Sequence, residues 1–115
     1  MKLSEQKSKP IVKGTAPLPK SEAEELLREI PEWSLAEGAI VRQFRFRDFR
    51  QAMVFVNTVA AIANEQDHHP DIFISYNKVL VNLSTHAVNG LSLNDFIVAA
   101  WIDLAEEDLH REQAA

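Results

Sequence analysis

The sequence predicts an α+β domain: a four-stranded antiparallel sheet with three helices packed on one face, in the order α-β-β-α-β-β-α. Two pairs of short apolar segments are each joined by a turn signal. Segments with apolar residues at helical spacing precede, separate and follow these pairs. A length of 115 residues suits one such domain with one hydrophobic core.

The first helix is expected to begin at Ser21 and to end before Pro31. The sequence Ser21-Glu22-Ala23-Glu24 has the pattern of a capping box, in which Glu24 reaches back to the Ser21 amide. Proline disfavours helical backbone in the residue before it, which sets the end of the helix. The expected buried stripe consists of Leu26, Leu27 and Ile30.

Two hairpins are expected to supply the four strands. The first joins residues 33–35 to residues 40–46 through Glu37-Gly38. The second joins residues 72–76 to residues 79–85 through Asn77-Lys78. In the last strand, one face is expected to carry Val79, Val81, Leu83 and Thr85, and the other Leu80, Asn82, Ser84 and His86.

The second helix is expected between Asp48, as its N-cap, and Asp67, because His69 precedes Pro70 and is pushed out of helical backbone. Its expected core stripe consists of Phe49, Ala52, Met53, Val56, Ala60 and Ala63. The third helix is expected to open at Ser92. Its expected stripe consists of Leu93, Ile97, Ala100, Trp101 and Leu104.

The net charge of −5 is unevenly distributed. Residues 1–20 carry five Lys and one Glu, so +4, which leaves −9 for the rest of the chain. We expect residues 1–20 to be a flexible basic tail and residues 21–110 to be a single domain. An acidic folded body argues against nucleic acid as a ligand.

Other partners and the compartment follow from what the sequence lacks. No segment approaches the ~20 apolar residues of a membrane span, and no signal-peptide pattern is present, so we expect a cytoplasmic protein without membrane contact. The absence of cysteine excludes disulfides, thiolate zinc sites and a cysteine nucleophile. A sheet covered on one side leaves its edges free, which makes a homodimer or homotetramer plausible.

The candidate chemistry lies in His68, His69 and His86, three of the four histidines in the chain. Histidine has the unperturbed pKa nearest neutral pH, so a histidine cluster is well suited to moving protons. If the second hairpin pairs around Asn77-Lys78, residue 71 lies opposite residue 83 or 84. This pairing brings His86 towards the other two histidines.

Each of these residues also has a purely structural interpretation. A single histidine at a strand end is more often a solvent-exposed polar residue than a catalyst. Asp95 occupies the third position of a helix capped by Ser92, where a carboxylate stabilises the helix start. Asp67 at the end of its helix opposes the helix dipole, which slightly favours a functional role.

Two other site chemistries are weaker. Zinc accepts three histidines and a water, but adjacent side chains in extended backbone diverge and no HExxH is present, so no metal is expected. Ser84 and Thr85 lie near His86, but no nucleophile-elbow motif frames them.

From about Trp33 to Asp103 the chain resembles the pterin-4a-carbinolamine dehydratase family. The core of the resemblance is His68-His69-Pro70, then five residues to Tyr76, nine more to His86 and eight more to Asp95. Further matching segments cover residues 44–49, 76–79, 83–86 and 90–92.

The resemblance implies dehydration of 4a-hydroxytetrahydropterin to quinonoid dihydropterin, without metal or organic cofactor, in recycling of the pterin used by aromatic amino acid hydroxylases. It implies that His68 and His86 are the acid/base pair and that His69 orients the pterin. It further implies a pocket lined by Asp67, Ser84 and Thr85. Trp33 is expected at its edge, with Asp95, Pro70 and Tyr76 as supporting residues.

One position departs from the family pattern. The acidic residue four before the first histidine is here Asn64, so any tuning of a histidine by that residue is lost. A second hypothesis is therefore a non-catalytic module that acts as a dimerisation or assembly cofactor of a protein partner. The retained histidines favour the enzyme, whereas Asn64 and the basic tail favour the module.

Overall fold

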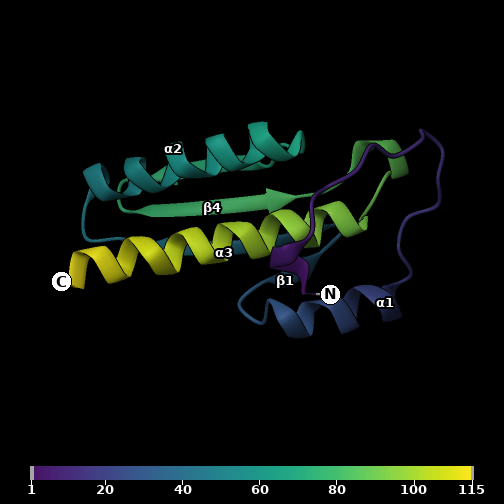
Figure 1. Cartoon of the computed structure of the whole chain (residues 1–115), viewed down its shortest axis with the longest axis horizontal. Coiled ribbons are helices and arrows are strands. Elements are labelled where there is room, and N and C mark those ends of the chain that lie inside the picture. Colours follow the sequence, from purple (N-terminus) through teal and green to yellow (C-terminus); the bar gives the residue numbers. More distant parts are fainter. Residues whose placement is uncertain (1, 115) are drawn as a thin grey trace.

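The computed structural model describes residues 2–114 (Figure 1). Its helices are α1 (Lys20–Leu26), α2 (Phe49–Gln66) and α3 (Leu93–Ala114). Its strands are β1 (Ser34–Ala36), β2 (Ala39–Arg45), β3 (Asp71–Ser75) and β4 (Lys78–Leu83). The described part also contains short 3-10 helices, namely η1 (Leu3–Glu5), η2 (Leu27–Glu29) and η3 (His86–Val88).

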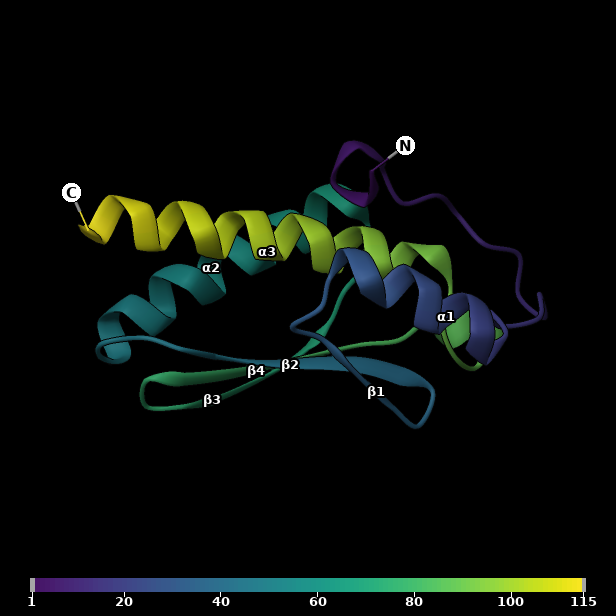
Figure 2. The same cartoon turned by 90° about the horizontal axis from the view of Figure 1, so that it is seen from below.

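The four strands form one antiparallel sheet in the order β1-β2-β4-β3. The three α-helices lie on the same side of this sheet (Figure 2). The predicted α+β fold and its element order are therefore confirmed. The helices cover the sheet face that carries the buried side chains of the central strands, namely Ile40, Phe44, Val79, Val81 and Leu83.

The second hairpin turns one residue earlier than expected. Its turn consists of Tyr76 and Asn77, and Ser75 pairs with Lys78. The Asn77 side chain donates to the Phe46 carbonyl at 2.9 Å, and the Phe46 amide donates to the Asn77 carbonyl at 2.8 Å. These bonds tie the turn to the end of β2. As a result, Asp71 lies opposite Asn82, whereas residue 83 or 84 was expected there.

The capping box expected for the first helix is wrong. Helix α1 begins at Lys20, with Pro19 as N-cap and without a side-chain cap bond. A capping box needs its serine at the extended N-cap position, whereas Ser21 is already inside the helix. The end is close to the expectation, because η2 leads into Ile30, which is buried immediately before Pro31.

Helix α2 begins after Asp48 as expected, and the Asp48 carboxylate accepts the Gln51 amide at 2.9 Å. The expected core stripe is partly wrong. Phe49 is 49% exposed, whereas Phe55 is fully buried. The Phe55 ring packs against Phe44 with ring centroids 4.6 Å apart. With Phe55 facing the core, Phe49 lies on the outer side of the helix. The buried hydrophobic residues of α2 are Ala52, Phe55, Val59 and Ala63.

Helix α3 is buried on more sides than a single stripe predicts. Leu93 and Leu104, expected in the core, are 40% and 46% exposed. Between them six hydrophobic residues are buried, namely Phe96, Ile97, Val98, Ala99, Ala100 and Ile102. The helix packs beside α2 and η1, so several of its faces are covered. Neither α3 nor any other described helix combines the length and apolar character needed to cross a membrane.

The segment before α1, expected as a flexible basic tail, lies against the domain in the structure (Figure 1). Leu3 is 1% exposed and belongs to the hydrophobic core. The indole nitrogen of Trp101 donates to the Gln6 carbonyl at 2.9 Å, and the Leu18 amide donates to the Leu91 carbonyl at the same distance. These contacts differ from the solvated arm that composition favours. The mobility of the segment in solution, and a domain boundary at residue 20, stay predictions.

Candidate active site

His68 and His69 lie directly after helix α2, where the chain turns towards β3. Asp67 ends the helix with φ of 50°, in the left-handed region, and the His68 amide donates to the Ala63 carbonyl at 3.1 Å. Asp tolerates this backbone conformation better than most residues other than Gly. The local role of Asp67 is therefore to end the helix and to direct the two histidines away from it.

His86 approaches from the end of β4. Because β3 and β4 are antiparallel, the start of β3 and the end of β4 are neighbours. The Thr85 amide donates to the Gly90 carbonyl at 2.7 Å, which closes the loop that carries His86. All three histidines line one cavity of about 360 Å³, and so do Asp67, Ser84 and Thr85.

His68 is paired with Asp95, a carboxylate that is completely buried. Nε2 of His68 lies 2.6 Å from Oδ1 of Asp95, whose side chain has no exposed surface. An ionised carboxylate can only accept, so Nε2 carries the hydrogen in this pair. Nδ1 is then the basic nitrogen of the neutral His68 ring.

The second oxygen of Asp95 is held by two further donors. The Thr85 hydroxyl donates to Oδ2 at 2.8 Å, and the Ser92 amide donates to it at 3.0 Å. The Ser92 hydroxyl lies 2.7 Å from the Thr85 hydroxyl and completes the chain of bonds. Asp95 therefore stabilises the start of α3 through the Ser92 amide, as expected, and also binds His68.

His69 has a different environment. Its Nε2 lies 3.0 Å from Oδ1 of Asn64, which is one turn back on α2, and both side chains are exposed. The position that departs from the resemblance in sequence is thus a neutral acceptor that contacts a histidine. Within residues 2–114, no three or more His, Asp and Glu side chains are grouped so as to hold a metal ion.

Four of the residues predicted for the site are not among those that line this cavity: Asp95, which is bonded to the lining residues His68 and Thr85, and Trp33, Tyr76 and Pro70. Trp33 is 3% exposed, and its indole nitrogen donates to Asp103 at 2.8 Å. Tyr76 is 63% exposed at the hairpin turn, at the other end of β4 from His86. Pro70 follows His69 and leads into β3.

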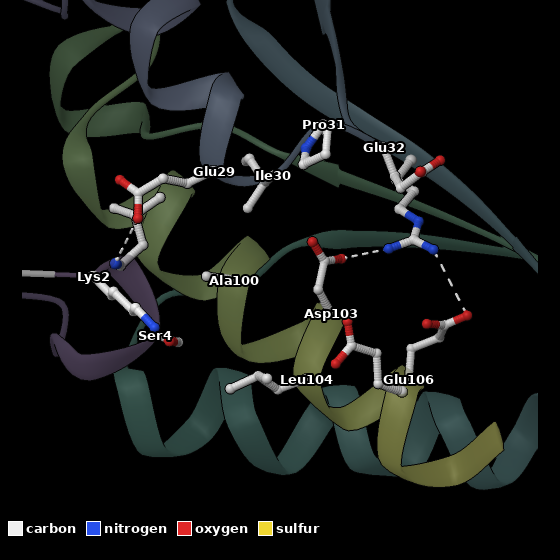
Figure 3. A pocket seen from close by; sticks show the side chains of 13 residues that line it. Lys2, Ser4, Glu29, Ile30, Pro31, Glu32, Ala100, Asp103, Leu104 and Glu106 are labelled. Carbon is white, nitrogen blue, oxygen red and sulfur yellow. Dashed lines mark hydrogen bonds and ion pairs between the residues drawn. The ribbon is translucent and has the colours of Figure 1, made fainter. Parts of the chain in front are cut away.

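A larger cavity of about 600 Å³ lies elsewhere, between the N-terminal segment, Ile30 and α3 (Figure 3). Three of its charged groups form an ion-pair network, in which Arg42 lies 2.7 Å from Asp103 and 3.7 Å from Glu106. Burial raises the pKa of Asp103 above its ordinary value, against the opposing effect of hydrogen bonds from Trp33 and Arg42. No histidine lines this cavity, so we place the candidate chemistry in the smaller one.

The sequence did not indicate one wall of the histidine cavity. Ser8, Lys9, Pro10 and Ile11, all from the expected tail, line it together with Gln66 and Asn94. In the sequence, Gln66 lies two positions before His68 and Asn94 lies directly before Asp95. This closeness to predicted site residues is the signal that could have indicated Gln66 and Asn94. The docking itself depends on contacts between residues 58 to 85 positions apart.

The fold and this cavity define a small α+β protein with a histidine-lined pocket beside a buried His–Asp pair. A family model described as "Pterin 4 alpha carbinolamine dehydratase" matches residues 16–105. The chain therefore belongs to the pterin-4a-carbinolamine dehydratase family, as its resemblance in sequence predicted.

Similar curated proteins cover most of the chain. A protein of Nitrosomonas eutropha is 47% identical over 103 residues, which cover 89% of this chain and 91% of the relative. A protein of Halorhodospira halophila is 44% identical over 105 residues, or 90% of this chain and 96% of the relative. Both are named "Putative pterin-4-alpha-carbinolamine dehydratase".

Two solved structures share the fold. A Brucella melitensis protein described as a transcriptional coactivator/pterin dehydratase has a TM-score of 0.74 and 38% identity, covering 76% of this chain and 96% of that one. A pterin dehydratase-like protein described as a RuBisCO assembly factor in the alpha-carboxysome has a TM-score of 0.53 and 20% identity, covering 63% and 83%. The second likeness concerns the fold alone.

Proposed function

We propose that this chain dehydrates 4a-hydroxytetrahydropterin to quinonoid dihydropterin and water. The observation that carries the proposal is that His86 and the Asp95-paired His68 line one cavity of about 360 Å³. That volume falls within the range of small-molecule sites. The family and the names of the relatives support the class of reaction.

The reaction breaks one bond and moves two protons. The hydroxyl on C4a receives a proton and leaves as water, and the electron pair of the C–O bond leaves with it. The ring nitrogen N5 loses its proton and forms a double bond to C4a. Two positioned imidazoles can serve as the acid and the base, and each such group typically contributes about 10²–10⁴-fold in rate.

We assign the base to His68 and the acid to His86. Because Asp95 accepts the Nε2 hydrogen, Nδ1 of His68 is free to take the N5 proton, and the buried carboxylate stabilises the imidazolium that forms. His86 is exposed, so solvent can renew the proton that it gives to the hydroxyl. His69 orients the pterin, while Asp67, Ser84 and Thr85 form the walls.

The proposed reaction needs no metal and no organic cofactor, because loss of water from C4a and N5 leaves the oxidation state of the substrate unchanged and imidazoles can move both protons. Its place is pterin recycling in the cytoplasm, beside a hydroxylase that consumes the reduced pterin. The acidic body of the chain supports a small-molecule substrate and no nucleic-acid ligand.

We further propose that the protein is a homodimer or a homotetramer. Strand β3 is a sheet edge, and three large side chains on or beside it, those of Phe73, Ile74 and Tyr76, are 58%, 41% and 63% exposed. An exposed apolar edge favours pairing with another strand. Light scattering tests this by measuring the mass of the particle in solution. The parent should exceed the 13.0 kDa of a single chain, and Phe73→Lys should shift the particle mass towards that of the single chain. A monomeric parent would remove the proposal.

A non-catalytic binding module is the second candidate. The neutral Asn64 beside His69 favours it, since the sequence pattern that the chain resembles commonly has an acidic residue at this position. One structural relative is described as a coactivator as well as a pterin dehydratase. The two candidates differ in turnover. The module binds its partner unchanged when His68 and His86 are both replaced by Ala.

The test of the proposed reaction is turnover of freshly generated 4a-hydroxytetrahydropterin, followed by formation of the quinonoid product. Addition of the protein should accelerate dehydration well above the spontaneous rate. His68→Ala should remove most of that acceleration while the near-ultraviolet circular dichroism stays that of the parent. A folded parent that does not accelerate the reaction overturns the proposal and favours the binding module.

A further inference from the structure

The N-terminal segment of residues 8–14, here called the strap, runs past the histidine cavity. Ser8, Lys9, Pro10 and Ile11 line this cavity opposite the histidine-bearing ends of α2 and β4. The strap lies before residue 16, where the match to the family model begins. It therefore adds a wall to a cavity whose histidines lie in the matched domain.

Asn94 holds the strap at one end with both atoms of its side-chain amide. Its Oδ1 accepts the Lys9 amide at 3.0 Å, and its Nδ2 donates to the Lys9 carbonyl at 2.7 Å. The residue is 9% exposed and directly precedes Asp95 at the start of α3. This paired contact fixes both the position and the direction of the strap backbone.

Gln66 makes a second contact, which is less completely satisfied. Its Oε1 accepts the Ser8 amide at 2.8 Å, and the Ser8 hydroxyl donates to its carbonyl. Its Nε2 is buried and has no hydrogen-bond partner among the described residues. An unpaired buried donor costs free energy, whereas both polar atoms of the Asn94 side chain are bonded to the strap, so Asn94 is the more fully satisfied of the two anchors.

The other end of the strap is fixed beside His86. The Gly14 amide donates to the Ala87 carbonyl at 3.0 Å, and Gly14 has φ of 92°, a conformation that favours glycine. The strap therefore spans the cavity from the end of α2 to the loop that carries His86. Pro10 within it has a fixed φ angle, which limits its freedom between the two anchors.

We propose that the strap is the outer wall of the pterin pocket and that Asn94 is the positioning residue that holds it there. Small-molecule sites bury most of their ligand's surface, and a cavity without this wall is open on one side. The inference rests on the proposed function, because it takes a pterin as the ligand. Loss of the wall should weaken pterin binding more than it affects proton transfer by the histidines.

The test measures binding of 7,8-dihydrobiopterin, a pterin without the leaving hydroxyl, by titration calorimetry. Asn94→Ala should raise Kd about tenfold, because the wall is no longer held against the ligand. The matched control is Trp101→Phe, which removes the bond to Gln6 upstream of the strap and should leave Kd within about twofold. Lys9→Pro removes the backbone hydrogen that Oδ1 of Asn94 accepts and keeps the bond from Nδ2 to the carbonyl of residue 9. It should raise Kd in the same direction as Asn94→Ala, without altering α3.

The outcomes separate this inference from the proposed reaction. An unchanged Kd in both Asn94→Ala and Lys9→Pro overturns the inference, as does a parent that binds no pterin. If the parent binds pterin and both Asn94→Ala and Lys9→Pro weaken binding, the strap is supported even when turnover of the 4a-hydroxy substrate is absent. Weaker binding in Asn94→Ala alone overturns the inference, because Asn94 itself lines the cavity. Absence of turnover overturns only the proposed reaction.

Discussion

The Asp95 carboxylate, which has no exposed surface, lies 2.6 Å from Nε2 of His68 at the edge of a cavity that also contains His86. The pair joins the start of α3 to the segment after α2, so the packing of two helices determines the orientation of one imidazole. It leaves Nδ1 as the basic nitrogen of the neutral ring. Three predictions concern this pair and the residues around it, and a fourth concerns Asp103 in the other cavity.

Replacing Asp95 by Asn should lower kcat by about 10²–10⁴-fold, because the amide neither stabilises the imidazolium of His68 nor enforces its tautomer. KM should change much less, since Asp95 does not line the cavity. Steady-state kinetics measure both values. Asp103→Asn is the matched control, since Asp103 is outside the histidine cavity. Equal kcat in Asp95→Asn and the parent would show that the pair has no part in turnover.

Replacing Thr85 by Val should lower the free energy of unfolding by about 1–3 kcal/mol, because a buried carboxylate loses one of its donors. Thr58→Val removes a hydroxyl bond to the Val54 carbonyl on the exposed face of α2, and it should change stability by less than about 0.5 kcal/mol. Urea titration compares both variants with the parent. A Thr85 variant as stable as the Thr58 variant contradicts the role given to this bond.

Replacing Asn64 by Asp should raise turnover at pH 7 by up to about fivefold. The substitution places a carboxylate of nearly the same shape beside Nε2 of His69 and favours the imidazolium, although the pair is exposed and the effect is correspondingly small. Steady-state kinetics at pH 7 compare the variant with the parent. Turnover equal to that of the parent would show that a carboxylate beside His69 does not limit the reaction.

Replacing Asp103 by Asn should change how stability depends on pH. Because burial raises the pKa of Asp103, the folded chain holds this proton at pH values where the unfolded chain has released it. The resulting stability is fully present below the unfolded pKa of about 3.9 and is lost as pH rises through the folded pKa. The unfolding free energy of the parent minus that of the variant should therefore fall with rising pH across this window. A difference that rises instead would contradict the raised pKa.

The order of helices and strands could be predicted because it depends on local apolar periodicity. The spacing of Val79, Val81 and Leu83 predicts one buried strand face, and all three are fully buried. The rotation of α2 could not be predicted in this way. The contact of Phe55 with Phe44, between residues on separate elements, decides that Phe49 faces outwards.

The site shows the same division. His68, His69 and His86 could be expected together because hairpin geometry brings the start of one strand beside the end of the other. Trp33 could not be placed from the sequence, because its position depends on a bond to Asp103, 70 residues away. The strap could not be foreseen either: its Lys and Pro content is typical of a solvated tail, and its contact with Asn94 spans 85 residues.

The most direct test of the account is turnover of freshly generated 4a-hydroxytetrahydropterin by the parent and by His86→Ala. His86 is exposed, so its replacement should leave the fold intact. His110→Ala is the matched control, because His110 lies on α3 beside Glu106 and Phe46, away from the histidine cavity. The account predicts acceleration by the parent and by His110→Ala, and loss of about 10²–10⁴-fold in His86→Ala. Equal acceleration by all three proteins would contradict the assignment of the site.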